Sequence, residues 1–190
     1  MNRRDVIRVA GAGAAATAAA ATGAAAAADA ATARPSGEVK PGLEFVFRAT
    51  VELEPPIEVG TYDNQRKRIV PINGGKVEGP RFKGVILPGG NDWQSLRATD
   101  GNTQIYARYT LKHDDGTIVS VINPGVRRGP PAVMAKLAAG EVVDPTLYYF
   151  RASPQFEVQP GPHGWLMENT FVCVGKRWPN AVDLDFYRVL

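Results

Sequence analysis

Residues 104–122, QIYARYTLKHDDGTIVSVI, contain the pattern that decides the fold. Apolar side chains alternate with polar ones in the first half, and the apolar ones that would share a face are Ile105, Ala107, Tyr109 and Leu111. A period of two is typical of a β-strand with one buried face. HDDG then supplies a turn in which Gly116 can take a positive φ, and TIVSVI runs back. The stretch predicts an antiparallel β-hairpin.

The same period appears in LEFVFRATVEL, residues 43–53, at the start of the domain. Further short apolar runs predict strands over 67–72, 81–87, 146–151, 165–175 and 182–190. Glycine pairs at 74–75 and 89–90 have turn chemistry, and PPAVMAKLAAG predicts one short helix near 130–140. Many short strands without βαβ alternation favour an all-β fold, an antiparallel sandwich or barrel.

The first thirty residues have the composition of an export signal. Paired arginines, Arg3 and Arg4, precede an alanine-rich run, and fifteen of the thirty residues are Ala. The pair resembles a twin-arginine signal, which predicts a periplasmic or secreted protein; the alternative is a retained anchor. We expect a signal over 1–30, a disordered linker over 31–42 and one domain over 43–190, with no membrane contact after cleavage.

Composition argues against several kinds of partner and cofactor. The formal net charge is +3 at pH 7 and the cations are scattered, so no nucleic-acid partner is expected. The single cysteine, Cys173, lies among apolar residues and is interpreted as a buried, inert thiol. With two histidines, His113 and His163, a dedicated metal site is not expected. No cofactor is predicted.

Several ordered motifs resemble one family. They are GGKVEGPRFKGVILPGGNDWQ, YTLKHDDGTIVSVINPGVRRG, DPTLYYFRASPQFEV and a late WLMENTF block. Together these are similar to the small proteins grouped as domain of unknown function 3237, over about residues 43–190. The resemblance implies a closed or nearly closed antiparallel β-barrel of the calycin-like kind. It implies no activity, because none is generally established for the family.

Asp92, in LPGGNDWQ, is the first candidate for chemistry. Beside Trp93 its pKa would rise on burial, which suits a general acid or base near neutral pH. Alternatively, an aspartate after Gly-Gly-Asn caps a turn by accepting backbone hydrogen bonds at the rim of the barrel. Glu78 is the candidate second carboxylate. Both interpretations stay open at this point.

Other polar and aromatic residues are candidate ligand contacts. Arg108 or Arg151 would clamp an oxyanion if it faces the interior, and Tyr149 with Trp93 would form walls. Asn169 needs hydrogen-bond partners, which a ligand or the neighbouring backbone could supply.

Two functions fit these residues. In the first, the barrel binds a small organic ligand and performs cofactor-free acid/base chemistry as an isomerase, dehydratase or lactone hydrolase. In the second, it is a non-catalytic carrier or a structural module, dimeric through an edge strand, and the same residues serve turns and buried networks.

Overall fold

The alternation in residues 104–122 folds as predicted into a hairpin of two antiparallel strands, Thr103–His113 and Ile118–Arg128, which are β5 and β6. A computed structural model describes residues 37–190, of which Pro41–Leu190 form one compact unit. The predicted export signal and the first part of the predicted linker lie outside the described residues. None of the helices described is long and apolar enough to cross a bilayer.

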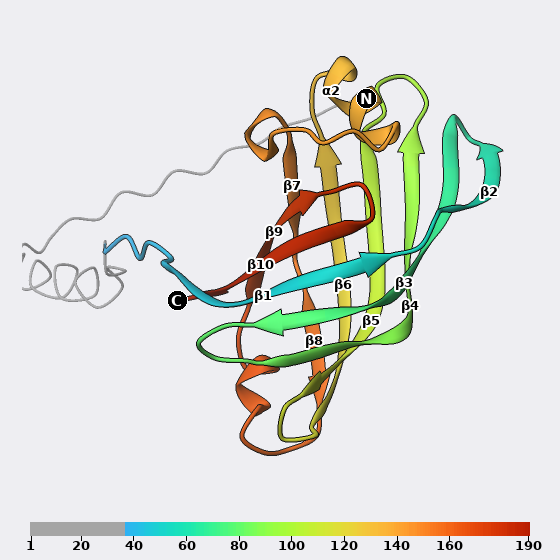
Figure 1. The fold of residues 1–190 in the computed structure, drawn as a ribbon. Helices are drawn as coiled ribbons and strands as arrows, with labels where there is room; N and C mark the ends of the chain where they lie inside the picture. Colours follow the sequence, from blue (N-terminus) through green and yellow to red (C-terminus); the bar gives the residue numbers. More distant parts are fainter. Residues whose placement is uncertain (1–36) are drawn as a thin grey trace, which may run out of the picture. The chain divides into compact units, whose positions relative to one another are not determined.

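The remaining elements follow in chain order (Figure 1). The strands are β1 (Leu43–Leu53), β2 (Ile57–Tyr62), β3 (Gln65–Glu78), β4 (Gly84–Arg97), β7 (Tyr149–Ala152), β8 (Gln155–Val158), β9 (Phe171–Arg177) and β10 (Ala181–Val189). The helical elements are α2 (Pro131–Ala138) and the 3-10 turns η1 (Pro145–Leu147) and η2 (Gly164–Leu166). The short helix confirms the prediction near 130–140, and its proline at the first turn loses no intrahelical bond.

The sheet closes on itself. Neighbouring strands run in the order β1-β10-β9-β7-β6-β5-β4-β3, all antiparallel, and β3 pairs again with β1. These eight strands form a closed barrel, while β2 extends from β3 and β8 pairs with β6 beyond β7. Closure leaves no free edge within the ring. The all-β antiparallel barrel expected from the sequence is confirmed.

Three local predictions were wrong. The two glycine pairs were interpreted as turns, but β3 runs through 74–75 and β4 runs through 89–90, each with a shift of register at that point. These are β-bulges, in which glycines at positive φ accommodate extra residues without ending the strand. Asp92 therefore lies within a strand and not at a rim turn. Residues 165–170, predicted as strand, contain η2 because the chain turns there before β9.

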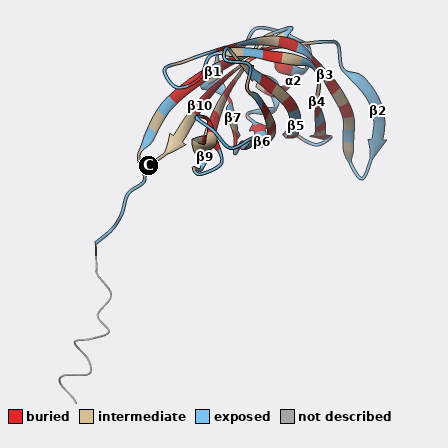
Figure 2. Cartoon of the chain, turned by 90° about the horizontal axis from the view of Figure 1, so that it is seen from below, coloured by how far each residue is buried: buried red, intermediate tan, exposed pale blue. Residues whose placement is uncertain are grey.

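The barrel has two unlike halves. Buried and exposed residues alternate along the strands (Figure 2), and toward the β5–β6 turn the inward positions are filled with aromatic rings. The Phe47 ring stacks on that of Phe186 with centroids 4.5 Å apart, and Phe156 meets Phe171 edge-on at 5.0 Å. This packing leaves the other half, around the start of β5, to hold polar residues.

The closure between β1 and β3 depends on Gly75. A Cβ at this position would lie 2.1 Å from the Thr50 carbonyl oxygen, and φ is +142°. Adjacent Gly74 has a φ of +140°, but its Cβ would come no nearer than 3.4 Å to the Ile86 oxygen. We expect Gly75→Ala to lower the free energy of unfolding by more than about 3 kcal/mol, and Gly74→Ala by about 1–2 kcal/mol from backbone strain alone. Urea denaturation checks this, and equal losses would contradict the role of close approach.

Candidate functional site

Inward side chains from all eight strands of the ring line a cavity of about 50 Å³ in the polar half of the barrel. Most of the residues that line it are apolar. The polar lining residues are Arg68 on β3, Asp92 and Gln94 on β4, Tyr109 on β5, Asn123 and Arg127 on β6, and Arg177 on β9. Strand alternation brings these residues together, because every second residue of each strand points inward. The cavity is mostly apolar with a few converging polar groups, as is usual for a ligand site.

Asp92 is held in a fixed orientation within this cavity. Its Oδ1 accepts a hydrogen bond from the Tyr106 backbone N–H at 3.1 Å, and its Oδ2 accepts one from Gln94 Nε2 at 2.6 Å. Gln94 Oε1 in turn accepts from Arg68 Nε at 2.9 Å. Burial raises the pKa of Asp92, although these hydrogen bonds and the nearby guanidiniums of Arg127 and Arg68 oppose the rise. Burial therefore favours the neutral form of this carboxyl group more than water does.

Three guanidiniums surround this single carboxyl group. Burial lowers the pKa of Arg127 to about 10, and the charges of Arg68 and Arg177 contribute to the lowering. The pKa values of Arg68 and Arg177 are also lowered, first by burial and then by the charge of a second arginine, which is Arg66 for Arg68 and Arg68 for Arg177. The cavity therefore carries excess positive charge, which an anionic ligand would neutralise.

Two buried polar atoms in the cavity have no hydrogen-bond partner among residues 37–190. They are Nε of Arg127 and Oδ1 of Asn123, which lie on the same face of β6. Arg127 is 3% exposed, so no bulk water compensates its unpaired donor. A buried donor without a partner costs about 1–3 kcal/mol, and more when charged, so it marks a place for a ligand atom.

The cavity is reached from the side where β1 leads into β2. Pro56 is exposed and Arg177 is half-buried, and both line the cavity. The guanidinium of Arg177 donates from one nitrogen to the Ala181 carbonyl oxygen at 2.9 Å. Arg177 thus lies near solvent, while Asp92 and Arg127 lie at depth.

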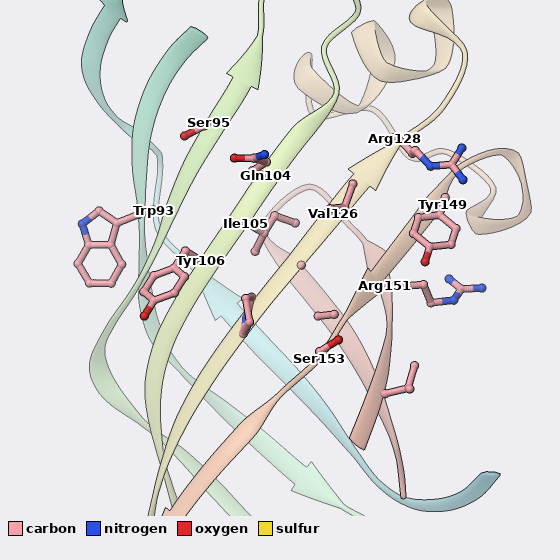
Figure 3. Close-up of a pocket in the computed structure, with 14 residues that line it drawn as sticks. Trp93, Ser95, Gln104, Ile105, Tyr106, Val126, Arg128, Tyr149, Arg151 and Ser153 are labelled. Carbon is pink, nitrogen blue, oxygen red and sulfur yellow. The ribbon is translucent and has the colours of Figure 1, made fainter. Parts of the chain in front are cut away.

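Three of the residues predicted as ligand contacts lie elsewhere, on the outer face of the barrel. Trp93, Tyr149 and Arg151 line an open groove of about 980 Å³ across β4 to β7 (Figure 3). Arg151 stacks over the Tyr149 ring at 5.1 Å and donates to the Phe150 carbonyl oxygen. Asp92 and Trp93 are adjacent in β4 and so face opposite sides of the sheet.

The other three predicted residues are also outside the cavity. Glu78 is exposed at the end of β3 and pairs with Lys76 at 2.6 Å. Arg108 is exposed on the outer face of β5. Asn169 donates to the Trp165 carbonyl oxygen at 2.7 Å, which is the backbone alternative foreseen for it. Of the predicted residues, the structure brings only Asp92 into the interior.

Sequence reasoning missed most of the cavity, although strand parity carried a signal. Asn123 and Arg127 have the same parity as buried Val119 and Val121 on β6. Arg68 shares its parity with Val70 on β3. A charged or amide residue on the apolar face of a strand is a candidate interior group, and this criterion would have found Arg68 within the predicted strand 67–72. Asn123 and Arg127 lie beyond residue 122, where the predicted hairpin ended, and β6 continues through them.

A second cluster lies at the turn end of the barrel. His113, Asp115 and His163 each offer one ligand atom, and these atoms lie within 4.8 Å of one another. His113 and His163 are far apart in the sequence, so their proximity in space could not be predicted from the spacing of a motif. Burial raises the pKa of Cys173, which is fully buried and remains a protonated thiol as predicted.

Comparison with known proteins agrees with the motifs of the sequence. The model of the family described as "Protein of unknown function (DUF3237)" matches residues 41–189. The chain belongs to the DUF3237 family. A protein of the UPF0311 group from Clostridium acetobutylicum is 40% identical over 147 residues, which cover 77% of this chain and 92% of the relative.

Solved structures similar to this DUF3237 chain support the same fold. A protein of unknown function from Rhodopseudomonas palustris has a TM-score of 0.76 at 35% identity, covering 81% of this chain and all of the other. A β-barrel-like protein from Acinetobacter baumannii has a TM-score of 0.72 at 35% identity, covering 82% of this chain and all of the other. A more distant relative, a hydroalkoxylation enzyme from Penicillium herquei, is 34% identical over 90 residues, which are 47% of this chain and 59% of that one.

Proposed function

We propose that this protein is a cofactor-free acid/base enzyme that binds a small organic acid inside the barrel and adds or removes an oxygen nucleophile at a carbon–carbon double bond. The observation that carries the proposal is Asp92 buried beside three guanidiniums, with Nε of Arg127 unpaired among the described residues. The arginines supply the anion site, and Asp92 supplies the proton.

The proposed reaction balances without a cofactor. Protonated Asp92 gives its proton to the carbon next to the substrate's carboxylate or carbonyl group, and a new C–H bond forms. The oxygen nucleophile bonds to the other carbon of the double bond, and its proton passes to the Asp92 carboxylate. The oxygen nucleophile adds ahead of carbon protonation, so negative charge gathers on the substrate's carbonyl oxygens until Asp92 delivers its proton, and the guanidiniums stabilise that charge. Elimination follows the same path in reverse.

The raised pKa of Asp92 supports the role of proton donor, because burial favours its neutral form. The Penicillium herquei relative supports the class of reaction, since hydroalkoxylation adds an oxygen nucleophile across a double bond. That likeness covers less than half of this chain, so it bears on reaction class and not on substrate.

The cavity limits the substrate. Its volume of about 50 Å³ is well below the ~300–1,000 Å³ of pockets for drug-sized ligands. We therefore propose a short unsaturated acid, with movement of Arg177 at the entrance to admit it. Export of the protein stays a prediction from residues 1–30.

The test is a comparison of crotonate and fumarate with the neutral analogue crotonamide. We expect the acids to raise Tm and the amide not to, with stabilisation of about 2.7 kcal/mol at a hundredfold excess over Kd. Proton NMR in D₂O should then show a hydroxy-acid product or deuterium at the carbon that Asp92 protonates. Equal stabilisation by the amide, or none by either acid, would contradict an interior anion site.

A further inference from the structure

The cluster at the turn end of the barrel joins segments that are far apart in the chain. His113 ends β5 and Asp115 lies in the β5–β6 turn, while His163 directly precedes η2 in the connection from β8 to β9. The side chain of His163 is 9% exposed and that of Asp115 is 43% exposed. The group thus has a buried side and a side open to solvent.

The contacts within the cluster are short. The Asp115 carboxylate reaches both imidazoles, with Oδ1 3.0 Å from His113 Nδ1 and Oδ2 2.9 Å from His163 Nε2. The two imidazole rings lie with centroids 4.1 Å apart. Phe82 packs its edge against both rings, at 4.8 Å from His113 and 5.5 Å from His163. The aromatic core therefore holds the two imidazoles in place.

The contacts of His113 Nδ1 make opposite demands on this nitrogen. It accepts a hydrogen bond from the Asp115 backbone N–H at 3.1 Å, which requires a free lone pair. It also lies 3.0 Å from Asp115 Oδ1, another acceptor, and that contact is favourable only if the nitrogen carries a proton. No single protonation state satisfies both contacts. A cation bound by the Nδ1 lone pair and by the Asp115 carboxylate would make the second contact favourable, and the Asp115 backbone N–H would then give up its hydrogen bond to Nδ1.

We propose that His113, Asp115 and His163 bind one divalent transition-metal ion of the zinc class. Two imidazoles and one carboxylate are ligands that Zn²⁺, Ni²⁺ and Cu²⁺ prefer over Mg²⁺ and Ca²⁺. A tetrahedral ion with bonds of about 2.0–2.1 Å needs ligand atoms about 3.3 Å apart. Asp115 Oδ2 lies 2.9 Å from His163 Nε2, and one ligand atom from each of the three residues lies within 4.8 Å of the other two, so side-chain adjustments would bring them to the distances that an ion requires. Three protein ligands leave one position open on the solvent side.

This metal site is separate from the proposed acid/base site. Asp92 pairs with Ala107, and His113 lies at the far end of β5, where it pairs with Gly84. At about 3.3 Å per residue the two sites lie about 20 Å apart along the barrel. The ion would instead fasten the β5–β6 turn to the β8–β9 connection.

The test titrates the full chain, without a histidine tag, with Zn²⁺ by calorimetry. We expect one equivalent to bind, Tm to rise by about 5–10 °C at a hundredfold excess over Kd, and EDTA to reverse the rise. Co²⁺ should give the visible absorption of a four- or five-coordinate ion. Mg²⁺ and Ca²⁺ should leave Tm unchanged.

Variants distinguish this site from binding elsewhere on the surface. His163→Gln and Asp115→Asn should each weaken Zn²⁺ binding by more than about 100-fold, beyond the 10–100-fold typical of outer-shell changes. An asparagine in place of Asp115 keeps an oxygen for the Thr117 N–H, which Asp115 Oδ1 now accepts at 2.8 Å, so the turn should be preserved. The matched control is Asp114→Asn, an exposed neighbour outside the cluster, which should bind Zn²⁺ as the original chain does. Failure of the original chain to bind Zn²⁺, or binding unaffected by both variants, would overturn the proposal.

Discussion

Replacing Asp92 with asparagine is expected to lower turnover by about 10²–10⁴-fold while the organic acid still binds. Asparagine has nearly the same shape and can accept the Tyr106 hydrogen bond, but it cannot exchange a proton at pH 7. Crotonate binding by thermal shift and turnover by NMR measure the two effects separately. Binding without turnover in both proteins would identify a carrier, and full turnover in Asp92→Asn would exclude Asp92 as the proton donor.

The same variant changes how stability depends on pH. Burial raises the folded-state pKa of Asp92 above its ordinary value of 3.8, so the unfolded chain loses this proton first as pH rises. The stabilising contribution is complete below pH 3.8 and is lost as pH rises through the folded-state pKa. The asparagine side chain does not titrate and has no such loss, although its NH₂ group would face the Gln94 donor. The stability of the variant relative to the original chain should therefore improve as pH rises. Urea denaturation at several pH values checks the sign.

Replacing Arg127 with methionine is expected to weaken binding of organic acids by about 10–100-fold and yet stabilise the barrel. Burial lowers the pKa of Arg127 from the ordinary value of arginine to about 10, so its charge costs the folded state about 3 kcal/mol at neutral pH. This cost is complete below pH 10 and falls as pH rises above 10 toward the ordinary pKa of arginine. Methionine removes the cost and keeps contact with Phe150, over whose ring the guanidinium lies at 5.9 Å. Lost attraction to Asp92 subtracts from the gain, and we expect Tm to rise by several degrees.

The matched control is Arg128→Met, one residue further along β6. Arg128 is exposed on the outer face and stacks over the Tyr149 ring at 4.7 Å, in the outer groove. This change should alter stability by no more than about 0.5 kcal/mol and leave binding of organic acids intact. If Arg128→Met bound organic acids more weakly and Arg127→Met bound them normally, the ligand site would lie in the outer groove and not in the interior cavity.

The β-structure of this chain was predictable because it depends on local pattern. Alternation along residues 104–112 predicts that Ile105, Ala107, Tyr109 and Leu111 face inward, and all four are buried in β5. The glycine pairs at 74–75 and 89–90 were wrongly predicted as turns, because a glycine at positive φ is equally compatible with a turn and with a β-bulge. Whether β4 stops or continues at 89–90 depends on its neighbours β3 and β5, which lie elsewhere in the chain.

For the candidate site, too, the sequence could select residues but could not say which of them face the interior. The sequence selected Asp92 as a carboxyl group that points either to a ligand or to its own backbone. It selected Trp93, Tyr149 and Arg151 as ligand contacts. Asp92 and Trp93 face opposite sides of the barrel wall because they are adjacent in β4, and the register of β4 against its neighbours places Asp92 on the inner side.

By itself the sequence determined the all-β class, the hairpin, the short helix and the family, because these follow from period, turn chemistry and ordered motifs within short stretches. Only the tertiary structure decided that three arginines surround Asp92 and that His113 meets His163 across the turn end. Barrel closure places residues from distant strands around one cavity, and a buried charge or an unpaired donor exists only once water has been excluded from them.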